Sequence, residues 1–584
     1  MSAGTGARRL ADESGFTLFV VMSVMLVISL FTIATFATVD GDTFGSARDV
    51  GRKQAYAAAE AGIADYLFHL NEDSAYWTKC DNPQQRDAAG NVIPNAVNQV
   101  YPGTGKLPNP SADPTFKWRT VPGSTARYAI ELVPVKRAVP CTPGANVAAT
   151  MMDEASRSLR IRATGRVQTA KGEVDRTIIA SLKRTSFLDY LYFTDYENMD
   201  AAWYTMAAKG GDTSSATKGD LRSWAASVCN RKYVRAPDNR DDHSWSGTYI
   251  DPADGRSRSL RVDCADYDLQ FAPWDRVLGP AHTNDELWVC NSPVFGRSLR
   301  DRIESLNGYR KACGVGAEPK IDGTWVPRAA MLTLPPTDAA LEAVALPAYK
   351  FTGRTNIELL SSPPDPGKPI RVTNAGLNGG AATDLAYPSN GVIYVKNGAC
   401  VPYDPLDPYA PGTATCGNAW VKGTYTKDLT IGSQNDIVVN GDVIRADGND
   451  SRLGLIADGF IRVWHDVIRD SRDPTSCSNY PPGDPRRVGD RRIDAAILSL
   501  QHSFMVDNYY CGTPLGTLTV NGAIGQKYRG PVGRLTSGAG TATNGYIKEY
   551  NYDDRLAFRG PPHFLDPVQA SWKVRSYTEQ LKAR

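Results

Sequence analysis

A long apolar run lies near the start of the chain. After a polar stretch that contains Arg8 and Arg9, residues 16–39 carry no charged side chain. About 20 apolar helical residues cross the hydrocarbon core of a bilayer, and a cleavable secretory signal has a shorter apolar region followed by a small-residue cut site. The run therefore predicts one membrane-spanning helix over residues 16–39, with the bulk of the chain outside the cytoplasm.

The helix is expected to continue beyond the membrane. Two glycines follow the apolar run, and each costs a helix about 1 kcal/mol relative to alanine. The pattern predicts that the helix resumes at residue 47 and continues to about residue 70. Its small-residue stripe allows close packing, either on the protein's own sheet or on another helix, and the sequence leaves both open. The stripe consists of Ala57, Ala61, Ala64 and Phe68.

Three strand-like runs follow a loop region over residues 71–125 that is rich in Asn, Pro, Asp and Gly. They cover residues 128–135, 159–167 and 174–182, and a short turn links the last two as a hairpin. A helix followed by such strands predicts an α+β unit, in which an antiparallel sheet buries one face against the second half of the helix.

The second half of the chain is predicted to be mainly β. Residues 275–565 contain many short apolar runs separated by Gly, Asn and Asp, without helical periodicity. A V-N-G pattern recurs at 439–444 and 520–525, with a shorter copy at 390–393. Asn-Gly can close a hairpin or turn a solenoid corner. We predict a right-handed parallel β-helix, and the alternative is a β-sandwich.

Charge and cysteine content narrow the class of protein. The chain of 584 residues has a net charge of +2, which argues against nucleic acid as a partner because phosphate binding needs a concentrated basic surface. The even number of cysteines, without C-x-x-C or nearby His clusters, excludes zinc and redox motifs and predicts disulfides in an exported chain. Neighbour pairing favours Cys400–Cys416 and Cys477–Cys511, and buried free thiols are the alternative. The remaining cysteines are Cys80, Cys141, Cys229, Cys264, Cys290 and Cys313.

The segment before the apolar run resembles a processing site. Residues 13–18, ESGFTL, resemble the type IV prepilin cleavage motif, and residues 57–62, AAAEAG, resemble the N-terminus of PilX-type and K-type minor pilins. The resemblance covers about residues 9–70. It implies that a prepilin peptidase cuts between Gly15 and Phe16 and that Phe16 is N-methylated. A plain signal anchor is the alternative.

One departure from the family pattern concerns Val20. Major pilins carry Glu at the fifth mature position, which is Val20 when Phe16 is the first. A carboxylate in the bilayer is costly without a cation, and in the family that cation is the neighbouring subunit's amine. The resemblance to K-type minor pilins therefore implies a tip or initiating subunit, whereas PilX-type proteins lie elsewhere in the filament.

A looser resemblance concerns the mainly β half. Several of its segments resemble large pilus-associated surface proteins that contain solenoids, and this resemblance implies a shared scaffold without implying any particular activity. The segments are residues 279–285, 454–457, 528–533, 552–556 and 561–564.

Candidate chemistry is sparse, because no nucleophile elbow, Walker A loop, H-E-x-x-H or Rossmann fingerprint occurs. His282 with Asp285 could bind metal or act as a base, but such a turn more often satisfies its own backbone. Asp553 and Asp554 beside Arg555 could form an acid pair as in polysaccharide lyases and hydrolases, but a surface ion cluster is favoured.

Two further segments have the same ambiguity. Residues 187–197 are rich in aromatic side chains, which form a core more often than a ligand platform. Residues 447–450, DGND, lack the spacing and the terminal Glu of an EF-hand, so a solvated turn is favoured over a calcium site.

We therefore expect a structural minor pilin or pseudopilin of a type IV pilus or related secretion filament, with neither enzymatic activity nor a cofactor. An adhesin that binds a surface or polysaccharide is the alternative, and a membrane-tethered β-helix enzyme is less favoured. The expected partners are other pilins, prepilin peptidase and the cytoplasmic membrane, and the expected final location is the pilus or cell surface. The expected domains are a leader (1–15), a helix (16–70), a β headgroup (71–185), a connecting subdomain (186–274), a solenoid (275–565) and a C-terminal cap (566–584).

Overall fold

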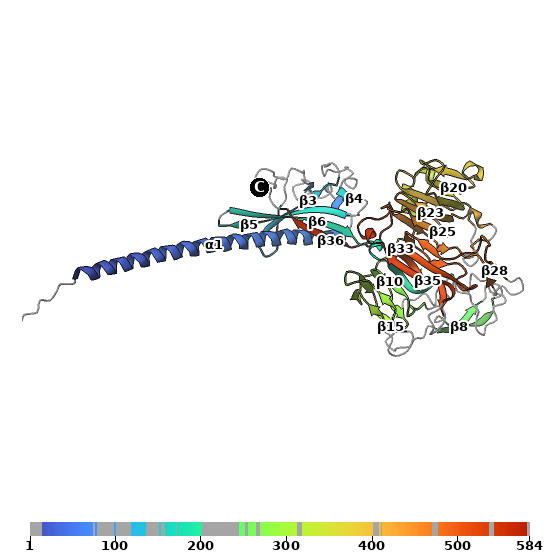
Figure 1. Ribbon diagram of the computed structural model, residues 1–584, viewed down its shortest axis with the longest axis horizontal. Coiled ribbons are helices and arrows are strands. Elements are labelled where there is room, and N and C mark those ends of the chain that lie inside the picture. Colours follow the sequence, from blue (N-terminus) through green and yellow to red (C-terminus); the bar gives the residue numbers. More distant parts are fainter. Residues whose placement is uncertain are drawn as a thin grey trace, which may run out of the picture. The chain divides into compact units, whose positions relative to one another are not determined.

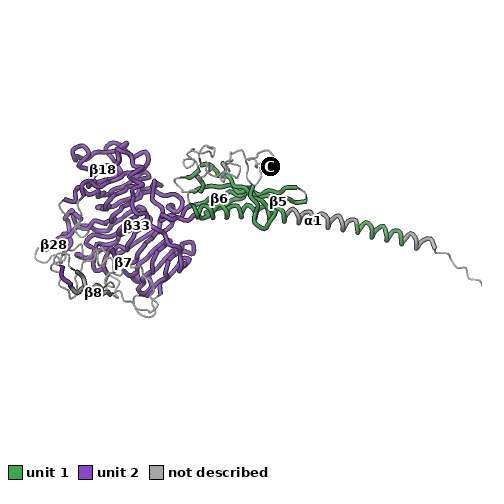
Figure 2. The backbone as a smooth tube through the Cα atoms, turned by 180° about the vertical axis from the view of Figure 1, so that it is seen from behind, with its two compact units in different colours: residues 1–153, 158–183, 572–584 green, residues 154–157, 184–571 purple. Residues whose placement is uncertain are grey.

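The chain folds as two compact units, shown in different colours in Figure 2. Unit 1 comprises residues 1–153, 158–183 and 572–584, and unit 2 comprises residues 154–157 and 184–571. Unit 2 is thus inserted into unit 1. The computed structural model describes residues 14–73, 76–78, 99–100, 118–135, 151–153, 158–170, 172–200, 202, 244–250, 255–263, 269–311, 318–400, 408–409, 412–469, 477–535 and 542–580.

The helix of unit 1 is α1, Ser14–Glu72. In its last turns one face of the helix is buried against the sheet. The buried residues on this face follow one another at helical spacing, and they are Ala55, Ala59, Ile63, Tyr66 and Leu70. The predicted stripe at positions 57, 61, 64 and 68 lies on the other face and is not in this core. The buried face is the larger one, because tyrosine, isoleucine and leucine remove more apolar area from water than alanine does.

The sheet of unit 1 lies along the second half of α1 (Figure 1). Its order is β1-β3-β5-β6-β36, and the pairs β3–β5 and β5–β6 are antiparallel. The three strands predicted for this region are present as β3, β5 and β6. The bounds are β1 Gln99–Val100, β2 Arg119–Thr120, β3 Arg127–Val133, β4 Met152–Asp153, β5 Ser158–Thr169, β6 Gly172–Arg184 and β36 Trp572–Glu579.

In its described residues, unit 2 is mostly β, with a curled 23-stranded sheet and few helices. Most strands of this sheet pair in parallel with strands far away in sequence, whereas a β-sandwich of hairpins pairs antiparallel neighbours. One series of parallel pairs, here called series C, aligns buried aliphatic side chains such as Ile431, Leu455 and Ile497 across successive strands. In pairing order its strands are β18 Lys350–Thr352, β22 Val392–Lys396, β24 Leu429–Ser433, β26 Leu453–Ala457, β31 Ala496–Ser499, β33 Pro514–Arg529, β7 Tyr192–Met199, β11 Ala281–Thr283, β14 Arg302–Ser305 and β17 Thr324–Val326.

A second set of parallel pairs, series G, runs beside the first. β33 belongs to both series, because its first half pairs with β30 and β35 and its second half with β31 and β7. The other strands are β19 Thr355–Leu359, β23 Ala419–Tyr425, β25 Ile437–Arg445, β27 Ile461–Val463, β32 Phe504–Val506, β30 Arg491–Ile493, β35 Ala542–Tyr552, β10 Arg276–Leu278, β13 Val294–Phe295 and β16 Lys320–Ile321.

Shorter elements complete the described part of unit 2. Antiparallel strands β20 and β21 extend the sheet from β19, and β34 pairs with β35. The bounds are β20 Ile370–Asn374, β21 Thr383–Leu385, β34 Gly533–Leu535, β12 Leu287–Val289, β15 Tyr309–Lys311, β28 Ile468–Arg469, β29 Cys477–Ser478, β8 Ser244–Ile250, β9 Ser257–Asp263 and the short helix α4 Ala339–Val344.

The chain enters unit 2 in the middle of the sheet. Its first strand there, β7, lies between β33, near the end of the chain, and β11. The sequence favours a core role for this aromatic-rich segment, and the burial of Tyr192 and Phe193 in the sheet core confirms it. The chain also leaves next to where it enters, because the Thr185 N–H donates to the Ser571 carbonyl at 2.8 Å.

Candidate functional sites

The first candidate site is an apolar segment of α1. The side chains of residues 21–32 are all exposed, and each of the large apolar ones exposes at least half of its surface. Across the described residues, no helix meets the length and apolarity of a membrane span. The side chains of residues 14–20 and 33–48 lie outside the description, so the predicted processing site and Val20 stay predictions. The exposed apolar side chains are Val21, Met22, Val24, Met25, Leu26, Val27, Ile28, Leu30 and Phe31.

The small-residue stripe of α1 is a second exposed surface. Ala57 and Ala64 are exposed, Ala61 is partly exposed, and Phe68 exposes 58% of its surface. Val50, about two turns before Ala57, exposes 50% of its surface. The stripe therefore does not pack on the protein's own sheet in the described part of unit 1.

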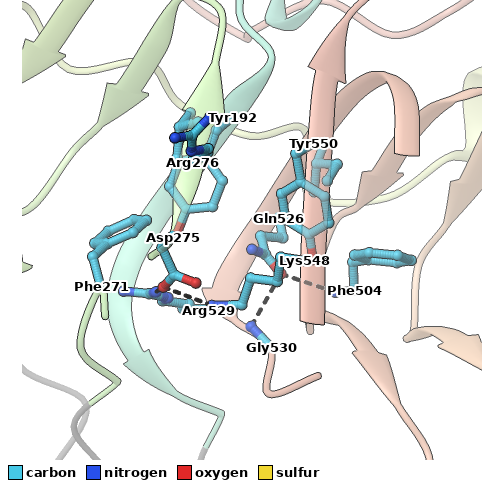
Figure 3. Close-up of a pocket in the computed structure, with 12 residues that line it drawn as sticks. Tyr192, Phe271, Asp275, Arg276, Phe504, Gln526, Arg529, Gly530, Lys548 and Tyr550 are labelled. Atoms are coloured by element: carbon cyan, nitrogen blue, oxygen red, sulfur yellow. Dashed lines mark hydrogen bonds and ion pairs between the residues drawn. The ribbon is translucent and has the colours of Figure 1, made fainter. Parts of the chain in front are cut away.

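A small cavity lined by charged and aromatic side chains lies inside unit 2 (Figure 3). Its volume of about 20 Å³ is room for one water molecule. Lys548 from β35 and Arg529 from β33 point toward Asp275, with a distance of 3.1 Å from Lys548 Nζ to Asp275 Oδ2. Arg529 Nη1 also lies 3.4 Å from Glu197 Oε2, and the guanidinium covers the Phe271 ring at 3.6 Å.

Burial shifts the pKa values of two side chains around this cavity. It lowers the pKa of Lys548 and raises the pKa of Glu197, while the charge of Arg529 opposes the shift at Glu197. The negative charges of Asp275 and Glu197 are balanced there by the positive charges of Arg529 and Lys548. The cavity is too small for a substrate, so its chemistry is that of an ion cluster that ties β7, β33 and β35 together.

The side chains of His282 and Asp285 are buried, and both have hydrogen-bond partners within the protein. His282 Nδ1 lies 2.9 Å from Glu304 Oε2, and His282 Nε2 lies 3.1 Å from Asn284 Oδ1. Asp285 accepts hydrogen bonds from the backbone N–H groups of Glu197 and Glu286 at 3.1 and 2.8 Å. Neither side chain faces solvent, so the arrangement is the backbone-satisfying turn that the sequence favours.

The acidic residues near the C-terminal end bind different arginines. Arg555 Nε donates to Asp553 Oδ1 at 2.8 Å, whereas Asp554 accepts two hydrogen bonds from Arg297 at 2.8 and 2.9 Å. Burial raises the pKa of Asp553 to about 6. Asp450, in the predicted solvated turn, also accepts from Arg555 at 3.0 Å. In the described part of the chain, no group of three or more His, Cys, Asp or Glu residues could hold a metal ion.

Two disulfides close loops of unit 2. Cys400 is bonded to Cys416 and Cys477 to Cys511, which confirms the two neighbour pairs that the sequence favours. Cys290 is also disulfide-bonded. The other cysteines lie outside the described residues, and they are Cys80, Cys141, Cys229, Cys264 and Cys313.

One acid pair gives no signal in the sequence. The Asp338 N–H donates to Asp458 Oδ1 at 2.7 Å, and the Tyr394 hydroxyl donates to Asp338 Oδ1 at 2.7 Å. Burial first, and then the charge of Asp458, raises the pKa of Asp338 to about 7, and burial raises the pKa of Asp458 to about 6. These residues are 120 positions apart, and neither belongs to a motif.

No protein-family model matches the chain, and no curated protein matches it. A solved structure, that of the competence-associated pilin ComZ from Thermus thermophilus, is similar over 91% of this chain and 97% of the ComZ chain. The sequences are 12% identical and the TM-score is 0.22.

Proposed function

We propose that the protein is a minor-pilin-like structural component of a type IV pilus or related secretion filament. The observation that carries the proposal is the exposed apolar segment at residues 21–32, which belongs to the same helix whose later turns are buried against the sheet of unit 1. Burying one large apolar side chain is worth about 1.5–3 kcal/mol. Nine such side chains in one segment call for an apolar environment outside the described fold.

Two environments fit this helix at different times. Before assembly, the segment and its undescribed neighbours in residues 16–39 would lie in the cytoplasmic membrane. After assembly, they would pack on the helices of other pilins, and the exposed stripe at positions 57, 61 and 64 would allow close approach. The bulk of the chain would then be displayed on the pilus or cell surface.

The position in the filament is part of the proposal. Val20 replaces the Glu that pairs with the next subunit's amine in major pilins, which favours a tip or priming subunit. We also propose that unit 2 is a right-handed parallel solenoid, which is supported by the parallel register of series C. A module of this size would be hard to repeat along a shaft without clashes.

Processing by prepilin peptidase gives the direct test. We expect the membrane form to lack residues 1–15 and to carry a methyl group on Phe16, which intact-mass and peptide mass spectrometry detect. A Gly15→Val variant, or a host without the peptidase, should retain Met1. An intact Met1 in peptidase-positive cells would sink the proposal.

An adhesin role is the second candidate, because one side of unit 2 presents a regular polar surface. Strands of series G carry a row of side chains that alternate in charge from β19 through β35, with Thr519 between the last two: the partly exposed Glu358 and the exposed Lys422, Asp442, Arg492 and Glu549. Such a surface suits a polar ligand such as a polysaccharide. Binding of the full chain to a glycan array, compared with a Lys422→Glu/Arg492→Glu variant, tests it: the variant should lose binding, and an unchanged profile contradicts this role.

We also propose that the protein is not an enzyme. What supports this is that both carboxylates of the candidate acid pair bind arginines, Asp553 with Arg555 and Asp554 with Arg297. A fixed ion pair leaves no carboxyl group free to exchange protons with a substrate. Polysaccharide depolymerisation by the purified chain would overturn this.

A further inference from the structure

A segment that crosses the sheet of unit 2 carries this inference. Residues 327–349, here called the crossing segment, connect β17 to β18. At its start the Ala329 N–H donates to the Ser305 carbonyl in β14 at 2.9 Å, and near its end Val344 O accepts from the Asn390 side chain before β22 at 2.6 Å. The segment therefore passes over series C from β14 to β22.

The crossing segment covers apolar side chains on the outer side of series C. Tyr394 on β22, Ile456 on β26 and Leu498 on β31 occupy one column of the register, and each is at most 1% exposed. Leu341 of α4 is fully buried in the same apolar cluster, and a methyl group at Gly432 would lie 3.1 Å from it. Lifting the segment would expose this column to water.

The middle of the crossing segment is held by a carboxyl pair. Asp338 is fully buried, its N–H and its Oδ1 are bonded to Asp458 and Tyr394, and its Oδ2 has no hydrogen-bond partner among the described residues. Two neighbouring carboxyl groups in an apolar site cannot both ionise without a large electrostatic cost. A proton on one of them removes that cost.

The charged groups around the pair do not offset the electrostatic cost of ionising both carboxyl groups. Glu342 of α4 and Asp458 both add negative charge near the Tyr394 hydroxyl. Lys527 is bonded to Gln501 Oε1 at 3.0 Å. Among the contacts of the described residues, no arginine or lysine bonds to Asp338 or Asp458.

We propose that Asp338 and Asp458 form a proton-binding site at which one bound proton latches the crossing segment onto the sheet. The segment is held in acid and released in base, because the second ionisation places two negative charges side by side beneath it. The pKa values of about 7 and about 6 put the release near neutral pH. Release uncovers the column of Tyr394, Ile456 and Leu498, which changes the surface that unit 2 presents.

Hydrogen exchange of the full chain in detergent tests the latch. After correction for intrinsic rates, backbone amides of residues 327–349 should lose about tenfold in protection between about pH 5.5 and about pH 8, since one pKa unit corresponds to a factor of ten. In Asp458→Asn the carboxamide supplies the donor without charge, so protection should be kept at both pH values. Asp365→Asn, at an exposed acid elsewhere in unit 2, should behave like the unmodified chain.

A second variant tests the sign. The Tyr394 hydroxyl stabilises the ionised form of Asp338, so Tyr394→Phe should raise the pKa of Asp338 and move the release to higher pH. Protection of β24 amides in the same spectra reports whether each variant is folded. The proposal is overturned by equal protection of the unmodified segment at both pH values, by an Asp458→Asn segment that is released like the unmodified one, or by a midpoint that moves to lower pH in Tyr394→Phe.

Discussion

The side chain of Asn71 in α1 forms two hydrogen bonds with the backbone of Trp572. Its Oδ1 accepts the Trp572 N–H at 2.6 Å, and its Nδ2 donates to the Trp572 carbonyl at 3.3 Å. The Trp572 side chain is 1% exposed and packs in the core between α1 and the sheet. The first helix and the last strand of the described chain are therefore joined at one residue, although all of unit 2 lies between them in sequence.

The first prediction concerns this joint. Asn71→Ala removes both hydrogen bonds and leaves the Trp572 backbone groups without their partner, so unit 1 should lose about 1–3 kcal/mol of unfolding free energy. Urea unfolding of the full chain, followed by exchange protection of β36 amides, measures it. Gln54→Ala, at an exposed position of the same helix, is the matched control and should change little. Equal protection of β36 in both variants would contradict the joint.

The second prediction concerns the inserted unit. The Thr185 N–H lies 2.8 Å from the Ser571 carbonyl, so a short glycine linker in place of residues 186–570 could close β6 onto β36. The shortened chain should keep the circular dichroism of a helix with an antiparallel sheet and unfold cooperatively. An unfolded product would show that unit 1 depends on unit 2.

The third prediction concerns Glu304, which accepts hydrogen bonds from Tyr190 and Arg302 and lies beside His282. Burial alone would raise its pKa, but these partners outweigh burial and lower the pKa to about 2 from an ordinary 4.5. Its stabilisation is therefore present above about pH 4.5 and is lost as the pH falls toward 2.

Glu304→Gln should accordingly cost unit 2 about 3 kcal/mol near neutral pH and much less near pH 2, because each pKa unit is worth about 1.4 kcal/mol. Denaturant melts of the variant and the unmodified chain across this range measure the difference. Glu358→Gln, at an exposed carboxylate of the same unit, is the control. A cost that does not change with pH would contradict the assignment.

The fourth prediction concerns the disulfide between Cys400 and Cys416. It closes a loop with a sequence separation of 16, and loops of that length are stabilised by about 3 kcal/mol through the entropy of the unfolded chain. The double Ser variant should melt at a lower temperature in calorimetry. Reduction should lower the melting temperature of the unmodified chain further than that of the variant, because the variant already lacks one of the bonds that reduction breaks.

Parts of the fold that depend on local pattern are predictable from the sequence. The run at 159–167 alternates clearly, and a short turn links it to the strand-like run at 174–182, so the hairpin β5–β6 follows from them. The two disulfides join cysteines that are neighbours along the chain, which is the pairing that the sequence favours. In each case the partners lie close together along the chain.

Other parts depend on distant partners and leave only a faint trace. β7 is an aromatic run whose neighbours are β33 and β11, and no local pattern marks such an insertion. The V-N-G echo also misleads about register, because Val520 pairs with Ile493 and Ile493 with Val443, not with Val439. A methyl group on Gly522 would lie 1.9 Å from a backbone oxygen, so this glycine marks close chain approach within β33.

A usable signal was present in the turns that follow the strands of series C. Ser433, Ser499 and Ser305 each end a strand, and each hydroxyl donates to a nearby backbone carbonyl, of Asp436, Gly459 and Gly308 respectively. A short aliphatic run that ends in Ser or Thr before a polar turn therefore recurs at intervals. That pattern marks some strands of series C, but it gives neither the order of the strands nor the acid pair, because Asp338 lies outside any repeat.

The return of the chain beside its point of entry has a mechanical consequence. Tension applied to unit 2 leaves through Thr185 and Ser571 together, so it draws β6 and β36 in the same direction and spares the bonds between them. The load is carried instead by two sets of contacts. One is the row of backbone hydrogen bonds between β5 and β6, which must break together for the strands to slide, and the other is the hydrogen bonding of Asn71 to Trp572. A filament subunit tethered through α1 would thus share any pull on its outer module between two independent attachments.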